Sequence, residues 1–207
     1  FSQLLNSRES FGVLSVALAA LANFDSRFEL CLRLNEIYPG DPGVFIALMM
    51  NHVHLQPGQA LYLPAGNIHA YLSGLGVEIM AASDNVLRGG LTAKHIDVAE
   101  LEAIVDFDAT AIEFVKQVEI AAGLVEFQTE ADDFILYRVE PSAQRVLADL
   151  QLGEDAVILC TAGEVAVSNS LGERLVLQRG EAAYSSKEAR LTTFAGSGTA
   201  FVAIGKD

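Results

Sequence analysis

The second half of the chain is a series of short apolar segments, and most of the connections between them contain glycine. Its segments are FILYRVE, AVILC, EVAVS, RLVLQ, EAAYS and AFVAI, all between residues 134 and 204. Runs this short, bounded by turn residues, are typical of strands and not of helices. Many short strands with glycine turns predict a β-sandwich or a β-barrel.

The first 50 residues have a different pattern. Apolar residues recur there at three- and four-residue spacing, in SVALAALANF and FELCLRLNEIY, which predicts helices. The segment YPGDPG ends this pattern, and Asp41 is suited to cap a short helix whose first residue is Pro42. After Asn51 the segment VHLQPGQALYLPAG again predicts strands.

Composition limits the class of protein. The 207 residues are 51% hydrophobic, which is enough to fill the core of one large domain or two small ones. The net charge of −14 argues against nucleic acid or an anionic membrane surface as a partner. The only two cysteines, Cys31 and Cys160, lie in no metal-binding spacing, and we interpret them as buried, reduced thiols of a cytoplasmic protein.

Residues 11–24 contain no charged side chain, so a secretory signal has to be considered. The stretch is too short to span a bilayer and follows the acidic Glu9, which argues against a signal. The chain starts at Phe1 and not at methionine, and we therefore expect it to lack its natural N-terminus.

One short motif occurs twice. Residues 55–62, LQPGQALY, match residues 177–184, LQRGEAAY, at an offset of 177 − 55 = 122. This indicates two related β-units, unless the phrase is only a common strand-turn-strand sequence. At the same offset His69 corresponds to Leu191, so any metal would belong to the first unit.

The histidine in LYLPAGNIHAY, His69, follows a glycine turn, where its ring could project into the mouth of a barrel. A lone histidine is more often structural than a ligand, because zinc needs three or four protein ligands. His52 and His54 would share one face of a strand, and we interpret them as solvent-facing. We interpret His95 as a non-ligand.

Charged residues stand out in GVEIMAASDNVLRGGLTAKH, residues 76–95. In an extended segment Glu78 and Asp84 share one face, so both carboxylates could line one cavity. Arg88 is the only charged residue between Asp84 and Lys94, beside two glycines. It is either functional or half of a buried Asp84–Arg88 ion pair, and spacing alone leaves both open.

Three regions together resemble a known family. They are YPGDPGVFIALMMN, LYLPAGNIHAYLSGLGVEIMAASDNVLRGGLTAKHIDVAEL and the strand-rich tail. These closely resemble the type I phosphomannose isomerases, zinc enzymes of the cupin class, and correspond to the later part of such an enzyme. The resemblance implies a mainly β fold: a helical segment (1–50), part of a catalytic cupin barrel with a linking helix (51–118), and a smaller cupin-like β-sandwich or jelly roll (119–207).

The resemblance also implies a metal site. In the family, zinc is held by a Gln-x-His pair and a glutamate from an N-terminal segment, together with the histidine that corresponds to His69. This chain has no Gln-x-His motif, because Gln56 follows His54. We therefore expect one zinc per complete enzyme, weak or absent zinc binding by this chain alone, and a missing N-terminal segment that completes the barrel.

Further roles follow from the family motifs. Arg88 corresponds to the catalytic arginine of Ser-Asp-Asn-Val-x-Arg, and Tyr71, Glu78 and Asp84 fall on positions that line the active site. The implied substrate is a phosphorylated hexose whose proton moves between C1 and C2 through an enediol. Glu78 and Asp84 are both candidates to carry that proton, and Lys94 either binds the phosphate or is a solvated turn residue.

Two functions therefore remain. The first is an isomerase of mannose 6-phosphate and fructose 6-phosphate, of which this chain alone is expected to be inactive. The second is a non-catalytic cupin-like module that binds a sugar or a protein. An upstream Gln-x-His segment would favour the enzyme, as does the joint presence of Tyr71, Glu78, Asp84 and Arg88.

Overall fold

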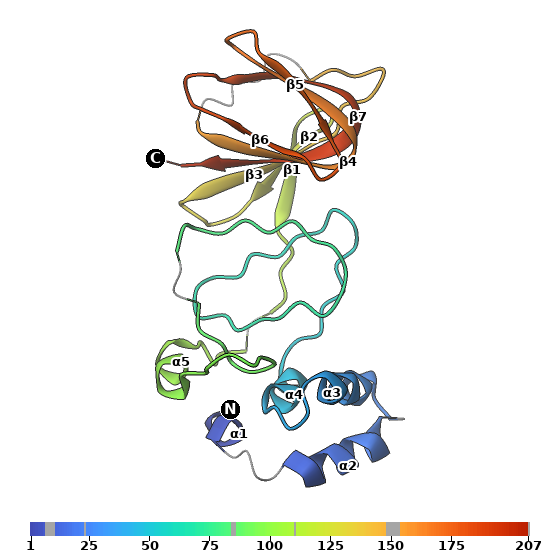
Figure 1. Cartoon of the computed structure of the whole chain (residues 1–207), viewed down its shortest axis with the longest axis vertical. Helices are drawn as coiled ribbons and strands as arrows, with labels where there is room; N and C mark the ends of the chain where they lie inside the picture. The colour runs from blue at the N-terminus through green and yellow to red at the C-terminus, as the bar shows by residue number, and fades with distance from the viewer. Residues whose placement is uncertain (7–10, 23, 84–85, 110, 148–153, 207) are drawn as a thin grey trace. The chain divides into compact units, whose positions relative to one another are not determined.

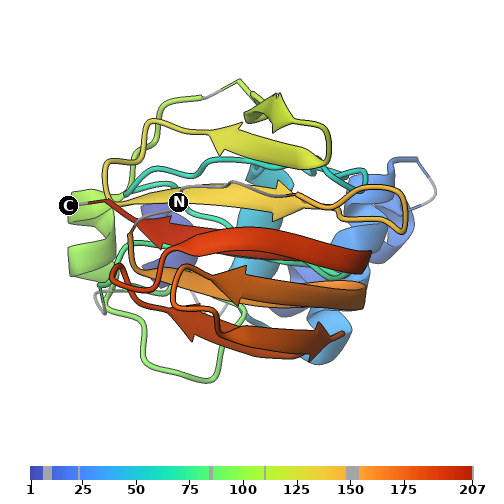
Figure 2. The same ribbon diagram turned by 90° about the horizontal axis from the view of Figure 1, so that it is seen from above.

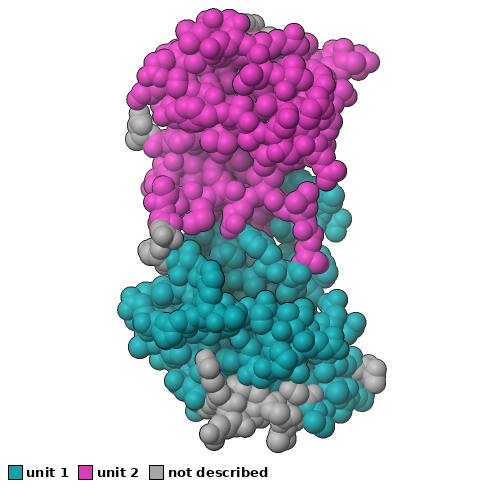
Figure 3. Space-filling model, in the orientation of Figure 1, with its two compact units in different colours: residues 1–58, 63–72, 84–113 teal, residues 59–62, 73–83, 114–207 magenta. Residues whose placement is uncertain are grey.

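The computed structural model describes residues 1–6, 11–22, 24–83, 86–109, 111–147 and 154–206, with the backbone alone for 11–15. The chain forms two compact units, coloured separately in Figure 3. The first unit contains residues 1–58, 63–72 and 84–113, and the second contains residues 59–62, 73–83 and 114–207.

The first unit contains the helices (Figure 1). They are α1 (Ser2–Asn6), α2 (Phe11–Leu21), α3 (Ser26–Ile37), α4 (Gly43–Ile46), the 3-10 helix η2 (Ala47–Met49) and α5 (Val98–Ile104). The helices expected before about residue 50 are present. None of the helices in the described ranges is long and apolar enough to cross a membrane.

Local sequence explains where these helices begin. The Asp25 carboxylate accepts the backbone amide of Arg27 at 2.9 Å, which caps the start of α3. The helix α4 begins at Gly43, one residue later than predicted, and the Asp41 carboxylate accepts the amide of Gly43. Asp97 caps α5 by accepting the amide of Glu100.

A small apolar cluster holds the helices together. Its buried members are Leu18, Leu30, Cys31, Leu34, Val44 and Phe45. The Cys31 thiol lies 3.1 Å from the carbonyl oxygen of Val44, and burial raises its pKa to about 11. Cys160 is also free and buried, so the interpretation of both cysteines as buried thiols is confirmed.

The second unit is an antiparallel sheet of seven strands. They are β1 (Lys116–Ala121), β2 (Leu124–Gln128), β3 (Phe134–Val139), β4 (Ala156–Asn169), β5 (Arg174–Gln178), β6 (Ala182–Ser185) and β7 (Leu191–Gly205). The order is β1-β2-β3-β7-β4-β5, and β6 also pairs with β4. The last strand, β7, therefore lies between β3 and β4 in the sheet (Figure 2).

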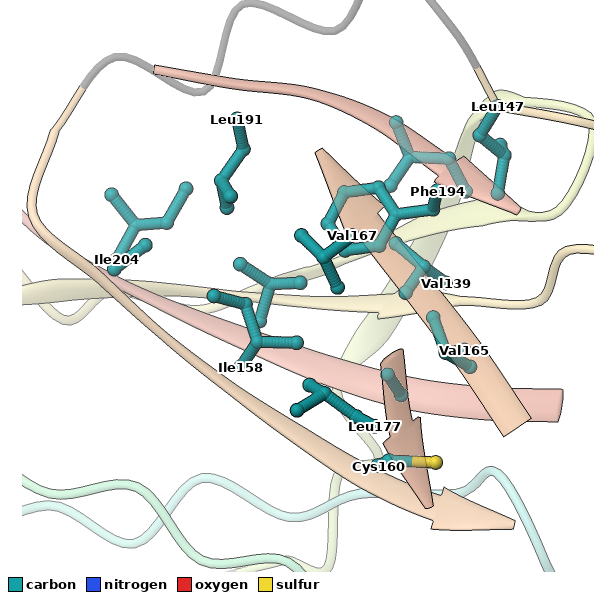
Figure 4. Packing of buried hydrophobic residues seen from close by; sticks show 14 residues of the cluster. Val139, Leu147, Ile158, Cys160, Val165, Val167, Leu177, Leu191, Phe194 and Ile204 are labelled. Carbon is teal, nitrogen blue, oxygen red and sulfur yellow. The ribbon is translucent and has the colours of Figure 1, made fainter. Parts of the chain in front are cut away.

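Strand β4 changes partner along its length. Its first residues, Ala156 to Leu159, pair with β6, and residues 164–168 pair with β5. The register with β7 shifts between Cys160 and Ala162, a bulge that bends the strand at the change of partner. The bent sheet surrounds the main core, whose side chains point toward one another in Figure 4.

The mainly β fold is confirmed, but the strands predicted between residues 51 and about 100 are not formed among the residues described there. Within the described part of that stretch the only pairing is a bridge between Leu61 and Phe114, beside a bond from the amide of Val115 to the oxygen of Ala60. Over these described residues the extended segments form no hydrogen-bonded ladder, and without a ladder they are not strands. The linking helix is only α5, and the strands β1 and β2 were not predicted.

Candidate active site

The turn that carries His69 is fastened to the end of α5. The amide of Asn67 donates to the oxygen of Pro64, and the amide of Asp106 donates to the oxygen of Gly66 at 3.0 Å. Gly66 has a φ of 82°, and an added Cβ would lie 2.8 Å from the oxygen of Ile104. The turn therefore requires glycine both for its backbone angle and for this close approach.

The ring of His69 has a defined orientation. Its Nδ1 lies 3.0 Å from the carbonyl oxygen of Asn67, and because a carbonyl only accepts, Nδ1 must be the donor. The lone pair of Nε2 then remains for a ligand, which is the arrangement of many metal-binding histidines. The exposed ring of Tyr71 packs edge-on, with its centroid 6.0 Å from that of His69.

The stretch around Arg88 adjoins the stretch around His69. An added Cβ on Gly89 would lie 2.5 Å from Cδ1 of Ile68, so the residue after Arg88 contacts the residue before His69. On the other side of Arg88, Leu87 packs on the cluster of Leu5, Ile46 and Leu101. Both neighbours of the half-exposed Arg88 are thus in contact with other parts of the first unit.

The other predicted residues are placed as follows. Lys94 is exposed, and its amide bonds the Thr92 hydroxyl at 3.1 Å. Glu78 is exposed and belongs to the second unit, where exposure alternates along residues 78–81, as in an extended segment. Asp84 lies outside the described residues, so the Asp84–Arg88 ion pair remains a prediction.

The remaining histidines are at the surface, as interpreted for His52 and His54, and the interpretation of His95 as a non-ligand stays a prediction. His52, His54 and His95 are all exposed. The rings of His52 and His54 lie on the same side of their segment, with centroids 4.7 Å apart. Among the residues that the structure describes, no three His, Cys, Asp or Glu side chains gather as a metal site. The free lone pair of Nε2 gives His69 the chemistry of one zinc ligand, and zinc sites take three or four protein ligands.

Sequence reasoning missed a second role for Asp41. One carboxylate oxygen accepts both the amide of Gly43 at 2.7 Å and the amide of Leu91 at 2.9 Å. The sequence indicated only the helix cap, because the partner Leu91 lies 50 residues further along the chain.

The chain has curated relatives. A comparison with models of protein families finds no match. Mannose-6-phosphate isomerase of Salmonella typhimurium is 36% identical over 204 residues, which is 96% of this chain and 51% of that protein. The Escherichia coli mannose-6-phosphate isomerase is 35% identical over 202 residues, with the same coverage of both chains. The chain thus spans about half the length of these relatives.

Solved structures give the same result. The Salmonella typhimurium mannose 6-phosphate isomerase bound to fructose 6-phosphate and zinc has a TM-score of 0.85 and 31% identity, over 100% of this chain and 53% of that one. A mutant of phosphomannose isomerase from the same organism has a TM-score of 0.86, also at 31% identity, over 100% and 54%. By sequence and by fold, the chain is therefore a homologue of the mannose-6-phosphate isomerases and corresponds to about half of such a protein.

Proposed function

We propose that this chain forms part of the active site of an isomerase that interconverts mannose 6-phosphate and fructose 6-phosphate. The main support is the geometry of His69. Its Nε2 lone pair remains for a ligand, and the residue before it, Ile68, contacts Gly89, the residue after Arg88. A structural neighbour at 31% identity binds fructose 6-phosphate and zinc. The free, buried thiols support a reducing compartment, the cytoplasm.

The reaction requires a proton to move between C1 and C2 of the open-chain sugar phosphate. Negative charge then develops on the enediolate oxygens, and the guanidinium of Arg88 would stabilise it. We assign the proton transfer to Glu78 or Asp84, the carboxylates of the candidate set. Tyr71 would line the sugar site, and Lys94 is the candidate for the substrate phosphate.

Zinc fits this proposal through His69. When bound, one zinc ion per complete enzyme would polarise the sugar oxygens. Its other ligands would come from a segment outside these 207 residues, which is also expected to complete the barrel. The exposed apolar side chains of the extended segments support such a cover. They include Leu63, Leu72, Leu75, Val77 and Met80.

Isotope incorporation tests the activity. The complete protein that contains this chain is incubated with mannose 6-phosphate in deuterated water, and both hexose phosphates are analysed by NMR. Fructose 6-phosphate carrying deuterium at C1 is expected, because proton transfer through an enediol exchanges with solvent. Sugar phosphate binding without product or deuterium would instead favour the non-catalytic cupin-like module.

Metal analysis tests the role of His69. The 207-residue chain alone is expected to retain no zinc after dialysis, because one imidazole supplies little of the free energy of a complete site. In the complete protein, zinc should be retained and should be lost in His69→Ala. One tightly held zinc in the chain alone would contradict the proposal, and His52→Ala and His54→Ala would then identify the ligands.

A further inference from the structure

Asp41 joins two turns that are distant in sequence. Its Oδ1 accepts the amide of Gly43 at the start of α4 and the amide of Leu91, three residues after Arg88. A helix cap needs only the first of these bonds. The second bond ties the segment that follows Arg88 to the helical part of the first unit.

The two turns also meet backbone to backbone. An added Cβ on Gly43 would lie 2.7 Å from the nitrogen of Leu91, and one on Gly90 would lie 2.6 Å from Cα of Gly43. Gly90 has a φ of 134°, and Leu91 has a φ of 52°, which is rare for leucine. The Leu91 side chain packs on the cluster that contains Val44. These contacts define one local arrangement, which we name the Asp41 clasp: Asp41, Gly43, Gly90 and Leu91.

An unfavourable backbone angle at Leu91 needs surrounding contacts to hold it. The carboxylate bond to its amide is charge-assisted and is among the stronger contacts available. Arg88 lies immediately before this clasp, with Gly89 against Ile68 between them. The backbone that carries the guanidinium is therefore held on both sides, by Leu87 in its cluster and by the clasp.

We propose that Asp41 is a positioning residue, which fixes Arg88 through the amide of Leu91. The kinetic part of this inference rests on the proposed isomerase function, whereas the structural part does not. Asp41 acts through the backbone and need not touch the substrate. Its loss should therefore lower turnover more than substrate affinity.

Hydrogen exchange tests the clasp in the 207-residue chain itself. Asp41→Ala should make the Leu91 amide exchange at least about tenfold faster, because a bond to a charged acceptor is lost. Asp41→Asn, whose amide oxygen can still accept both bonds, should restore much of the protection. Leu30→Ala is the control, since it removes a buried side chain of the cluster on which Leu91 packs but removes neither hydrogen-bonding partner of Asp41. Equal exchange at Leu91 in Asp41→Ala and in the unchanged chain would overturn the proposal.

Steady-state kinetics of the complete protein test the effect of the Asp41 clasp on turnover. Asp41→Ala should lower kcat about 10- to 100-fold and change KM less than about twofold, as expected when a reacting group is displaced. Asp41→Asn should recover most of the turnover. Gly43→Ala, which pushes against the Leu91 nitrogen, should reproduce the loss with Asp41 intact.

The stability control separates positioning from simple damage. If Asp41→Ala and Leu30→Ala lower the melting temperature equally and also lower kcat equally, Asp41 is only a structural residue and the proposal is wrong. If the unchanged complete protein has no isomerase activity, the proposed function fails, and exchange at Leu91 still decides whether Asp41 holds this turn.

Discussion

The two copies of the LQ-x-G motif have the same turn and different surroundings. Gly58 and Gly180 have φ angles of 89° and 88°, so the local backbone is repeated along with the sequence. The copy at residues 177–184 joins β5 to β6, both paired with β4. The copy at residues 55–62 has one bridge, at Leu61. Local sequence therefore determines the turn, whereas strands need a partner.

The side chains that follow the two turns differ in the same way. Leu191 is 2% exposed and belongs to the main core, while His69, at the same offset of 122, is exposed. Leu191, which follows the second copy, packs in the core, whereas His69, which follows the first copy, exposes an imidazole. We therefore assign stability to the sheet of β1 to β7 and propose the chemistry for the region that follows the first copy, and this contrast can be tested.

The largest expected effect is on the core of the second unit. Val165→Asp should lower the free energy of unfolding by about 4 kcal/mol or more, because it buries an unpaired carboxylate at a fully buried position. Thermal unfolding measures it. Val157→Asp is the control, because Val157 lies on the same strand and is half exposed.

Correctly folded molecules of Val165→Asp in the complete protein should keep near-normal turnover. Normal stability with abolished turnover would show that the sheet of β1 to β7 takes part in the chemistry, and the contrast would fail.

Arg88→Ala should act on the reaction and not on the fold. In the complete protein we expect turnover to fall by the equivalent of about 2–4 kcal/mol, with little change in KM, because the cation matters most when the enediolate forms. Arg33→Ala, an exposed arginine of α3, is the control for the loss of one charge. A rise in KM alone would identify Arg88 as a phosphate-binding or structural residue.

The reactivities of the two thiols allow the stabilities of the two cores to be compared, because Cys31 lies in the helical cluster and Cys160 in the core of the sheet. With a pKa raised from 9.0 to about 11, the thiolate fraction of Cys31 at pH 8 is about a hundredfold lower than that of an unperturbed thiol. Its alkylation by iodoacetamide should be slow and should increase with pH up to about 11. Burial also raises the pKa of Cys160.

Peptide mapping by mass spectrometry gives the rate at each cysteine. In the unfolded chain both rates should level off near pH 9. Because the helical cluster is smaller than the core of the sheet, Cys31 should react before Cys160 as denaturant is added. The reverse order would contradict the view that the sheet is the more stable region.

The smallest expected effect compares the two glycine turns. An alanine at either position is strained by the positive φ, at a cost of about 1 kcal/mol. Gly180→Ala should show this cost in thermal unfolding, because its turn is held between paired strands. Gly58→Ala should lower the stability of the chain alone by less, because its turn can relax. An equal loss of stability in both variants would mean that the turn at Gly58 is held as firmly as the turn at Gly180.

The sequence predicted the elements that have a clear apolar face. RLVLQ is β5 in full, whereas AVILC and EVAVS are one bent strand, because the bulge at Cys160 continues the ladder. Strand β1 was missed because nearly all its side chains are exposed and it lacks a buried face. Within the site, the isolation of Arg88 and the glycine turn before His69 were visible. The contact of Asp41 with Leu91 was not, since no local pattern records a partner 50 residues away.

The position of β7 in the sheet has a consequence for biosynthesis. Within the described residues, 116–139 form one antiparallel group and 156–185 another, and β7 is the strand that pairs with both. A ribosome that has not yet made residues 191–205 therefore carries two half-sheets, with β3 and β4 each presenting an open edge. Such edges pair readily with other chains. The nascent chain should be most dependent on chaperones during the translation of this last strand.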